Sequence, residues 1–359
     1  MSRGFGGLIA AGVLCLTVLP AEAQPTVTDV SGALANSQTI TIRGTSFGTK
    51  GVAAPLVWED FADGALDPSL TPHGLLTVSN TDNLRHPFSS RNARADFKLT
   101  DGNWDGHYFQ YNGGTARKWF VQYWIKLATN WHWGTTGSDG GDGGLANVKF
   151  FRMLPSGDRN YANVGYSTHG FQDGEVLRFV EHGEQTYLGI NGQDLFTPDA
   201  WHSVQIEYGE NGGAGQANGT MRLWIDGSLK DSTSMLDTNP VDDGEPVDKR
   251  PYIIGFYDSW GPSVAPGDNM FAYYSDLYVD SSWSRVELGN APTYAASTHR
   301  EMLIPTAWSP NAITVRVTQG TFRPGDKAYI YVVDSSGKVN GIGFKVNVTA
   351  AGGNPPHRQ

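Results

Sequence analysis

Aromatic and polar side chains that suit sugar binding gather in four short stretches of the sequence. In the segment 118–127, alternation places Gln122 and Trp124 on one face of a predicted strand. Indole and phenol rings stack on the C–H faces of sugar rings, and amide, ammonium and guanidinium groups hydrogen-bond hydroxyls and carboxylates. The candidate substrate-binding residues are Gln122, Trp124, Trp131, Trp133, Lys149, Arg152, Tyr257 and Trp260.

These residues also have structural interpretations. Trp124 fits a second hydrophobic layer under a loop. Trp131 and Trp133, in a glycine-rich stretch, either flank a ligand or pack the loop 128–146 onto the body of the protein. Lys149 either points to solvent or meets an acidic or hydroxylated sugar.

Catalytic residues do not emerge from the sequence. It contains no Gly-x-Ser-x-Gly elbow for a nucleophilic serine. Tyr166, His169, Arg152 and Lys149 have the chemistry to abstract a proton and to neutralise a carboxylate, but no spacing brings them together. Whether the protein is an enzyme stays open.

The elements that would position these side chains are strands. Residues 201–208 and 220–226 alternate, and Asp226-Gly227 supplies a tight turn after the second of them. Long loops are expected at 128–146 and 233–251, where binding residues are often found. Further predicted strands cover 118–127, 147–154, 163–167, 176–180, 252–257 and 271–279.

Composition agrees with an all-β protein and excludes some partners. The 359 residues include 45 glycines, and 12% are aromatic. A net charge of −10 argues against nucleic acid as a partner, because phosphate binding needs basic patches. No stretch after the first 23 residues is long and apolar enough to insert in a membrane.

The first 23 residues have the pattern of a secretory signal. Arg3 precedes an apolar run, and Ala21-Glu22-Ala23 matches a cleavage site that would leave Gln24 first. We therefore expect a secreted protein, extracellular or periplasmic. Cys15 lies in the apolar run, so the mature chain would have no disulfide and no thiol ligand.

The strand pair resembles a known fold. The patterns "W…V.I.Y" at 201–208 and "G…LW.DG.L" at 219–229 resemble neighbouring strands of the concanavalin A-like jelly roll of legume lectins and laminin G modules. The resemblance covers residues 57–290 and implies a β-sandwich that hosts many functions. It also implies a structural Ca²⁺ held by Asp60 and Asp276, which otherwise cap strand ends.

The catalytic motifs of enzymes with this fold are missing. Glycosidases of the class carry a strand with Glu-x-Asp-x-Glu, which this sequence lacks. Alginate-lyase-type enzymes carry three strand motifs, to which Arg91–Arg94 and Tyr108-Phe109-Gln110 are at best weakly similar. The residues Gln205-Ile206-Glu207 end in Glu where the lyase motif has His.

The two ends of the chain resemble halves of another domain. Residues 39–48, "TITIRGTSFG", resemble the start of an IPT/TIG domain, a small immunoglobulin-like sandwich, and the strands predicted in 304–348 resemble its back half. We expect 24–56 and 291–350 to form one sandwich with the jelly roll 57–290 inserted, and 351–359 to form a disordered tail. A separate C-terminal module is the alternative.

The sequence thus favours a secreted protein that binds a polysaccharide or other glycan through an aromatic-lined jelly-roll groove. A polysaccharide lyase or glycoside hydrolase on the same fold is the first alternative. A structural or adhesive surface protein is the second. The glycan and the oligomeric state stay unknown.

Overall fold

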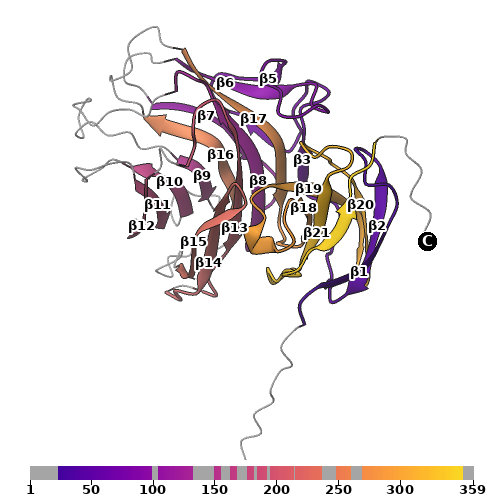
Figure 1. Ribbon diagram of the computed structural model, residues 1–359. Helices are drawn as coiled ribbons and strands as arrows, with labels where there is room; N and C mark the ends of the chain where they lie inside the picture. Colours follow the sequence, from indigo (N-terminus) through magenta and orange to yellow (C-terminus); the bar gives the residue numbers. More distant parts are fainter. Residues whose placement is uncertain are drawn as a thin grey trace, which may run out of the picture.

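Two β-sandwiches make up the described part of the protein (Figure 1). The computed structural model describes residues 23–98, 104–131, 149–154, 162–167, 176–181, 184–191, 195–213, 215–236, 248–259 and 269–350. Residues 1–22 of the expected signal segment 1–23 and the expected tail 351–359 lie outside these residues. The described helical structure is one 3₁₀ turn, η1 (Tyr294–Ala296), and none of it has the length and hydropathy to span a bilayer.

The larger sandwich is a jelly roll of two sheets, so the all-β prediction is confirmed. Its outer sheet has the order β12 (Glu184–Asn191), β11 (Val176–Glu181), β10 (Ala162–Ser167), β9 (Lys149–Leu154), β16 (Arg250–Ser259), β7 (Trp104–Tyr111), β4 (Leu70–Pro72). Its inner sheet has the order β15 (Ser228–Leu236), β14 (Gly219–Ile225), β13 (Trp201–Gly209), β8 (Lys118–Leu127), β17 (Asn269–Asp280), β6 (Asn92–Lys98), β5 (Leu76–Asn80), with β3 (Val57–Glu59) on β17.

Alternation within the strands builds the core between these sheets. Trp119, Val121, Tyr123 and Ile125 of β8 all lie in it and are at most 1% exposed. Each large apolar side chain of this kind contributes about 1.5–3 kcal/mol when fully buried. The opposite face of β8, with Gln122 and Trp124, is therefore turned away from the jelly-roll core.

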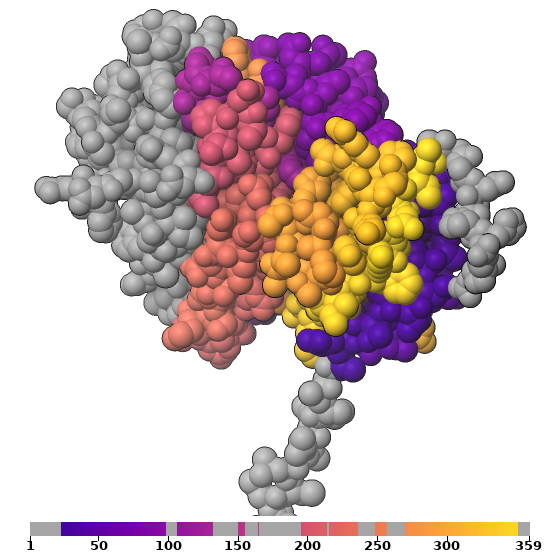
Figure 2. Space-filling model, in the orientation of Figure 1, coloured from indigo at the N-terminus to yellow at the C-terminus, as the bar shows by residue number. Residues whose placement is uncertain are grey.

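The smaller sandwich is built from both ends of the chain. Its sheet has the order β1 (Thr26–Ser31), β2 (Thr39–Thr45), β20 (Ala312–Arg316), β19 (Arg300–Ser309), β18 (Arg285–Gly289), β21 (Lys327–Val333), β22 (Phe344–Asn347). The first half of β19 pairs with β18 and the second half with β20, so this strand carries the sheet from one layer into the other. Figure 2 shows the indigo N-terminal and yellow C-terminal segments packed in one lobe.

One core unites these strands. Ile40 and Ile42 of β2 pack with Leu303, Ile313 and Val332. β18 belongs to this sheet as well, whereas the expected boundary at 290/291 leaves it with the jelly roll. The likeness to an IPT/TIG domain stays a prediction.

The shared core gives the first testable prediction. Residues 24–48, joined by a short Gly/Ser linker to residues 284–350, should fold without the jelly roll, because all seven strands and about 90 residues suffice for a domain. A single cooperative thermal transition is expected by circular dichroism. A gradual, non-cooperative loss of signal would show that this sandwich depends on the jelly roll.

Candidate functional site

The outer sheet carries a cluster of aromatic and polar side chains on the face away from the core. In β7, Phe109 and Tyr111 belong to the core, so alternation turns Tyr108 and Gln110 to the other side. In β9, Phe151 and Met153 belong to the core and Arg152 between them does not. We call the face with His73, Tyr108, Gln110, Arg152, Arg250 and Tyr252 the outer face.

The rings on the outer face contact one another. The imidazole of His73, directly after β4, is stacked on Tyr108 with ring centroids 4.5 Å apart and planes at 13°. The ring of Tyr252 lies 6.0 Å from that of Tyr108. His73 Nε2 lies 3.0 Å from Gln110 Oε1, and Gln110 Nε2 donates to Asn112 at 2.9 Å. Tyr108 is 6% exposed, whereas His73, Gln110 and Tyr252 are half-buried, so Tyr108 supports the groups that a ligand can reach.

Strand register brings a guanidinium into line with this cluster. Ile254 pairs with Phe109, and Ile253 pairs with Arg152 on the next strand. Arg152 is therefore two strand spacings, about 10 Å, from Gln110. Arg250, opposite Leu154, follows on the same face. Both arginines are half-buried.

The other two polar candidates, Gln122 and Trp124, lie at the junction between the sandwiches. The smaller sandwich covers the face of β8 that carries them, so that Gln122 is 0% and Trp124 4% exposed. Gln122 Oε1 accepts a hydrogen bond from Gln205 at 2.7 Å. This corrects the expectation of an open groove there. Its cause is an apolar contact between the sandwiches, formed by Phe120, Tyr278, Trp283, Met302 and Ile304.

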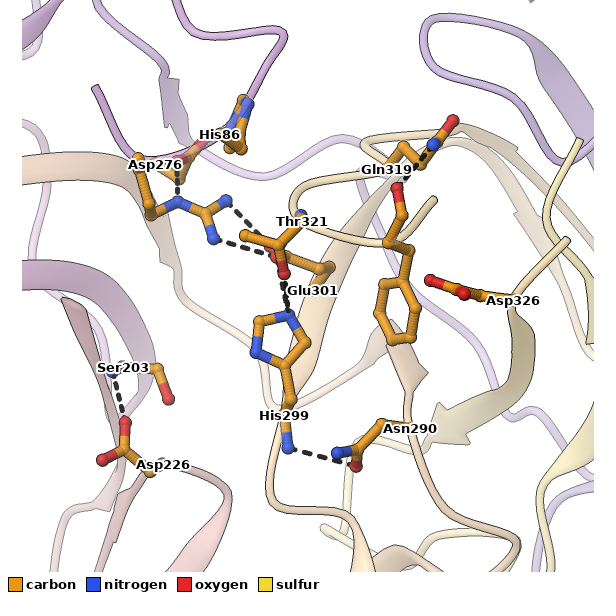
Figure 3. A network of polar contacts seen from close by, with 12 residues as sticks. His86, Ser203, Asp226, Asp276, Asn290, His299, Glu301, Gln319, Thr321 and Asp326 are labelled. Atoms are coloured by element: carbon orange, nitrogen blue, oxygen red, sulfur yellow. Dashed lines mark hydrogen bonds and ion pairs between the residues drawn. The ribbon is translucent and has the colours of Figure 1, made fainter. Parts of the chain in front are cut away.

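A buried arginine ties the two sandwiches at this junction. Arg85 Nε donates to Asp276 of β17 at 2.6 Å, and its two terminal nitrogens donate to Glu301 of β19 at 2.9 Å each (Figure 3). The guanidinium lies 4.3 Å above the Trp124 ring. His299 Nε2 lies 2.9 Å from Glu301 Oε1. One cation thus joins a carboxylate from each sandwich.

Burial and nearby positive charge shift the pKa values of the Asp276 and Glu301 carboxyls in opposite directions. Burial alone would raise the pKa of Glu301, but Arg85 and the hydrogen bond with His299 lower it to about 2. Burial acts likewise on Asp276, and Arg85 and His86 hold the pKa of that carboxyl well below its ordinary value. Both groups are therefore ionised at neutral pH, as an intact pair requires.

A second buried network extends the junction. Arg285 Nη1 donates to Glu207 of β13 at 2.7 Å, and Arg285 Nε pairs with Glu287 at 2.5 Å. Arg300 pairs with Glu287 at 2.7 Å and donates to Gln205 at 2.8 Å. These buried charges form ion pairs across the two sandwiches. The pairing matters because an unpaired buried charge would cost several kcal/mol.

The remaining candidates fall in three places. Trp131 is 6% exposed and packs between the sheets, with Phe97 and Phe256 at 5.1 and 5.6 Å, so it anchors the start of its loop in the core. The backbones of Lys149 and Tyr257 are paired in register at one end of β9 and β16. Trp133 and Trp260 lie outside the described residues.

The carboxylates expected to bind calcium have protein partners. Asp276 pairs with Arg85, and Asp60 Oδ1 accepts the backbone N–H of Ala62 at 3.0 Å. Over the described residues, no three His, Cys, Asp or Glu side chains are close enough to hold a metal ion. A calcium ion stays a prediction, which the melting temperature with and without chelator checks.

Of the six outer-face residues, the sequence candidates include only Arg152 and miss the other five: His73, Tyr108, Gln110, Arg250 and Tyr252. The alternation in residues 106–111 carried a usable signal for Tyr108, since it separates Tyr108 and Gln110 from the core residues Phe109 and Tyr111. His73 follows a three-residue strand and Tyr252 lies at a β-bulge, so neither had a regular pattern around it.

Comparisons with known proteins assign no family. No family model and no curated protein matches the sequence. Among solved structures, the chain is similar to alginate lyase Aly36B in complex with alginate trisaccharide, with TM-score 0.42, 10% identity, and coverage of 64% of this chain and 99% of that one. It is similar to an endo-β-1,4-glucuronan lyase from the fungus Trichoderma reesei, with TM-score 0.42, 15% identity, and coverage of 64% and 96%. It is also similar to lectin UEA-II complexed with galactose, with TM-score 0.37, 11% identity, and coverage of 63% and 100%.

The ionised state of Glu301 predicts acid sensitivity. A carboxyl with a folded pKa near 2 and an ordinary value of 4.5 stabilises the fold above about pH 4.5 and loses this contribution as the pH falls toward 2. The loss should be about 2 kcal/mol between pH 7 and pH 3, and about 3 kcal/mol once the carboxyl is fully protonated below pH 2. Urea denaturation at pH 7 and at pH 3 measures it, and Glu301→Gln should be destabilised at pH 7 and show a smaller difference between the two pH values.

Asp199 supplies the control for this prediction. Its side chain is 60% exposed and pairs with Lys126, so Asp199→Asn should change the free energy of unfolding by less than about 1 kcal/mol at either pH. Equal behaviour of Glu301→Gln and Asp199→Asn would contradict a stabilising role for the Arg85 pair.

Proposed function

We propose that the protein binds an acidic polysaccharide on the outer face of its jelly roll. The contact that carries this proposal is the stack of His73 on Tyr108, with Tyr252 beside it and Gln110 bonded to the imidazole. These groups belong to three neighbouring segments of one sheet. The proposal has two parts: the ligand is a polysaccharide, and that polysaccharide carries carboxylate groups.

The rings suit the apolar faces of a sugar. A pyranose presents a patch of C–H groups on each side, and an aromatic ring covers such a patch with little loss of side-chain entropy. Tyr252 is half-buried, so its ring has both support from the sheet and access to a ligand. The Gln110 amide is close enough to bond a hydroxyl of the same sugar.

The charges suit a carboxylated sugar. Arg152 and Arg250 lie beside the rings. The whole chain has a net charge of −10, whereas these two residues are cationic. Guanidinium groups bind carboxylates through paired, charge-assisted hydrogen bonds. A uronate-containing chain therefore fits the outer face better than a neutral glucan.

A second candidate function is β-elimination on the same polysaccharide. The specific observation is that an imidazole and a phenol are in contact on a face that also holds an arginine. Elimination needs a base at the carbon beside the carboxyl group and a cation or amide that neutralises the carboxylate. Formation of unsaturated uronate, followed by ultraviolet absorbance, separates this candidate from binding alone.

The binding proposal predicts which variants lose affinity. Tyr252→Ala should weaken binding to polygalacturonate or alginate at least tenfold, since a stacking contact contributes more than about 1.4 kcal/mol. Arg152→Gln should weaken binding to the acidic polymer and leave binding to its carboxyl-reduced form unchanged. Isothermal titration at low salt measures both, with thermal melting as a check on folding.

Phe88 provides the matched control. It is an aromatic residue 40% exposed on the loop between β5 and β6, and Phe88→Ala should bind as wild type does. A folded Tyr252→Ala protein with undiminished affinity would refute the outer face as the site. Equal affinity of wild type for the acidic and the carboxyl-reduced polymer would refute only the preference for acid.

A further inference from the structure

The two segments that connect the sandwiches lie side by side and are joined by a buried lysine and aspartate. Lys50 follows β2 on the way into the jelly roll, and Asp280 ends β17 on the way back. Lys50 Nζ lies 2.6 Å from Asp280 Oδ2, and the two side chains are 2% and 5% exposed. The pair is thus closed to solvent at the place where the chain enters and leaves the inserted domain.

The surroundings hold both groups in fixed positions. Lys50 Nζ also donates to the carbonyl oxygen of Ala53 at 2.8 Å, and the Trp308 ring centroid lies 5.7 Å away. The Tyr278 hydroxyl donates to Asp280 Oδ2 at 3.3 Å. The carboxyl oxygen nearest the amine therefore has a proton donor of its own.

Burial shifts the two groups toward their uncharged forms. It lowers the pKa of Lys50, against the opposing effect of the Asp280 carboxylate, and it raises the pKa of Asp280, against the opposing effect of the Lys50 ammonium. Transfer of one proton within the pair yields an amine and a carboxylic acid in contact. An uncharged amine is a nucleophile, and a protonated carboxyl is the form that it attacks.

We propose that Lys50 and Asp280 join in an amide bond between their side chains once the protein has folded. Lys50 Nζ attacks the Asp280 carboxyl carbon, and the C–O bond to Oδ2 breaks. Oδ2 leaves as water with one proton from the nitrogen and one from the Tyr278 hydroxyl. A second proton from the nitrogen then restores the Tyr278 hydroxyl. No oxidant or other reactant is needed. Fixed contact between two reacting groups corresponds to effective concentrations far above any reached in solution, which favours condensation.

Another buried pair has similar contacts but a different place in the fold. Lys249 and Glu210 are 2.8 Å apart and have no exposed side-chain surface, and burial lowers the pKa of Lys249 too. Its carboxyl partner, however, lies between Lys249 and the Tyr208 hydroxyl, and the pair joins the end of β13 to the start of β16 within one sandwich. An amide bond between Lys249 and Glu210 would link residues of one sandwich only. A bond between Lys50 and Asp280 would instead close the chain from 50 to 280, which contains the jelly roll, into a covalent ring.

Mass spectrometry of the denatured full-length protein tests the proposal. The expected mass is 18 Da below the value calculated from the sequence and the observed N-terminus, by loss of one water. Proteolysis should release one branched peptide that contains both Lys50 and Asp280. Lys50→Arg keeps the positive charge and cannot form this amide, so it should show full mass and no branched peptide, and Lys249→Arg should behave as wild type does.

Two results would overturn the proposal. One is a folded wild-type protein with full mass and separate peptides for positions 50 and 280. The other is a loss of 18 Da with the two peptides separate, because dehydration of another aspartate to a cyclic imide changes the mass without linking them. Circular dichroism of the Lys50→Arg variant establishes whether it is folded when its mass is read.

Discussion

The position of Arg85 between Asp276 and Glu301 is the constraint on which the arrangement of the two sandwiches depends. A guanidinium removed from water must have its charge matched nearby, and here each sandwich supplies one carboxylate. Separation of the sandwiches would leave Asp276 with the arginine and expose Glu301 and the apolar contact around Met302. Arg285 and Arg300 repeat the same requirement a short distance away. The junction therefore combines an apolar contact with ion pairs whose geometry fixes how the two sandwiches meet.

The junction decides which face of the jelly roll is covered. It covers the inner sheet at Gln122 and Trp124, and it leaves the outer sheet with His73, Tyr108 and Tyr252 on the side away from the smaller sandwich. The inner sheet thus attaches the two domains, and we propose that the outer sheet binds the ligand.

The sequence predicts local structure here better than it predicts which surfaces meet. Alternation in 118–127 separates Trp119 and Tyr123 from Gln122 and Trp124, and the structure has the same two faces. The sequence does not show that the second face is covered, because the covering strands begin more than 150 residues later along the chain. The resemblance assigns Asp276 to calcium, whereas its partner Arg85 lies in a loop with no sequence pattern that links the two residues.

The candidate site was found in part for the same reason. Arg152 follows from its strand alternation, whereas His73 depends on the pairing of a three-residue strand with β7, which no short-range pattern encodes. Trp131 is of a residue type that often contacts ligands, but it lies in the core. Its burial depends on Phe97 and Phe256 from two other strands. Residue type alone does not separate these cases.

Hydrogen exchange on the full-length protein, with and without an oligouronate, tests the central claim most directly. The account predicts slower exchange at the backbone amides of β7, β9 and β16 when the sugar is bound, with no change in β8 or β19 at the junction. Slower exchange confined to the junction or to the smaller sandwich, with β7 and β16 unaffected, would contradict it.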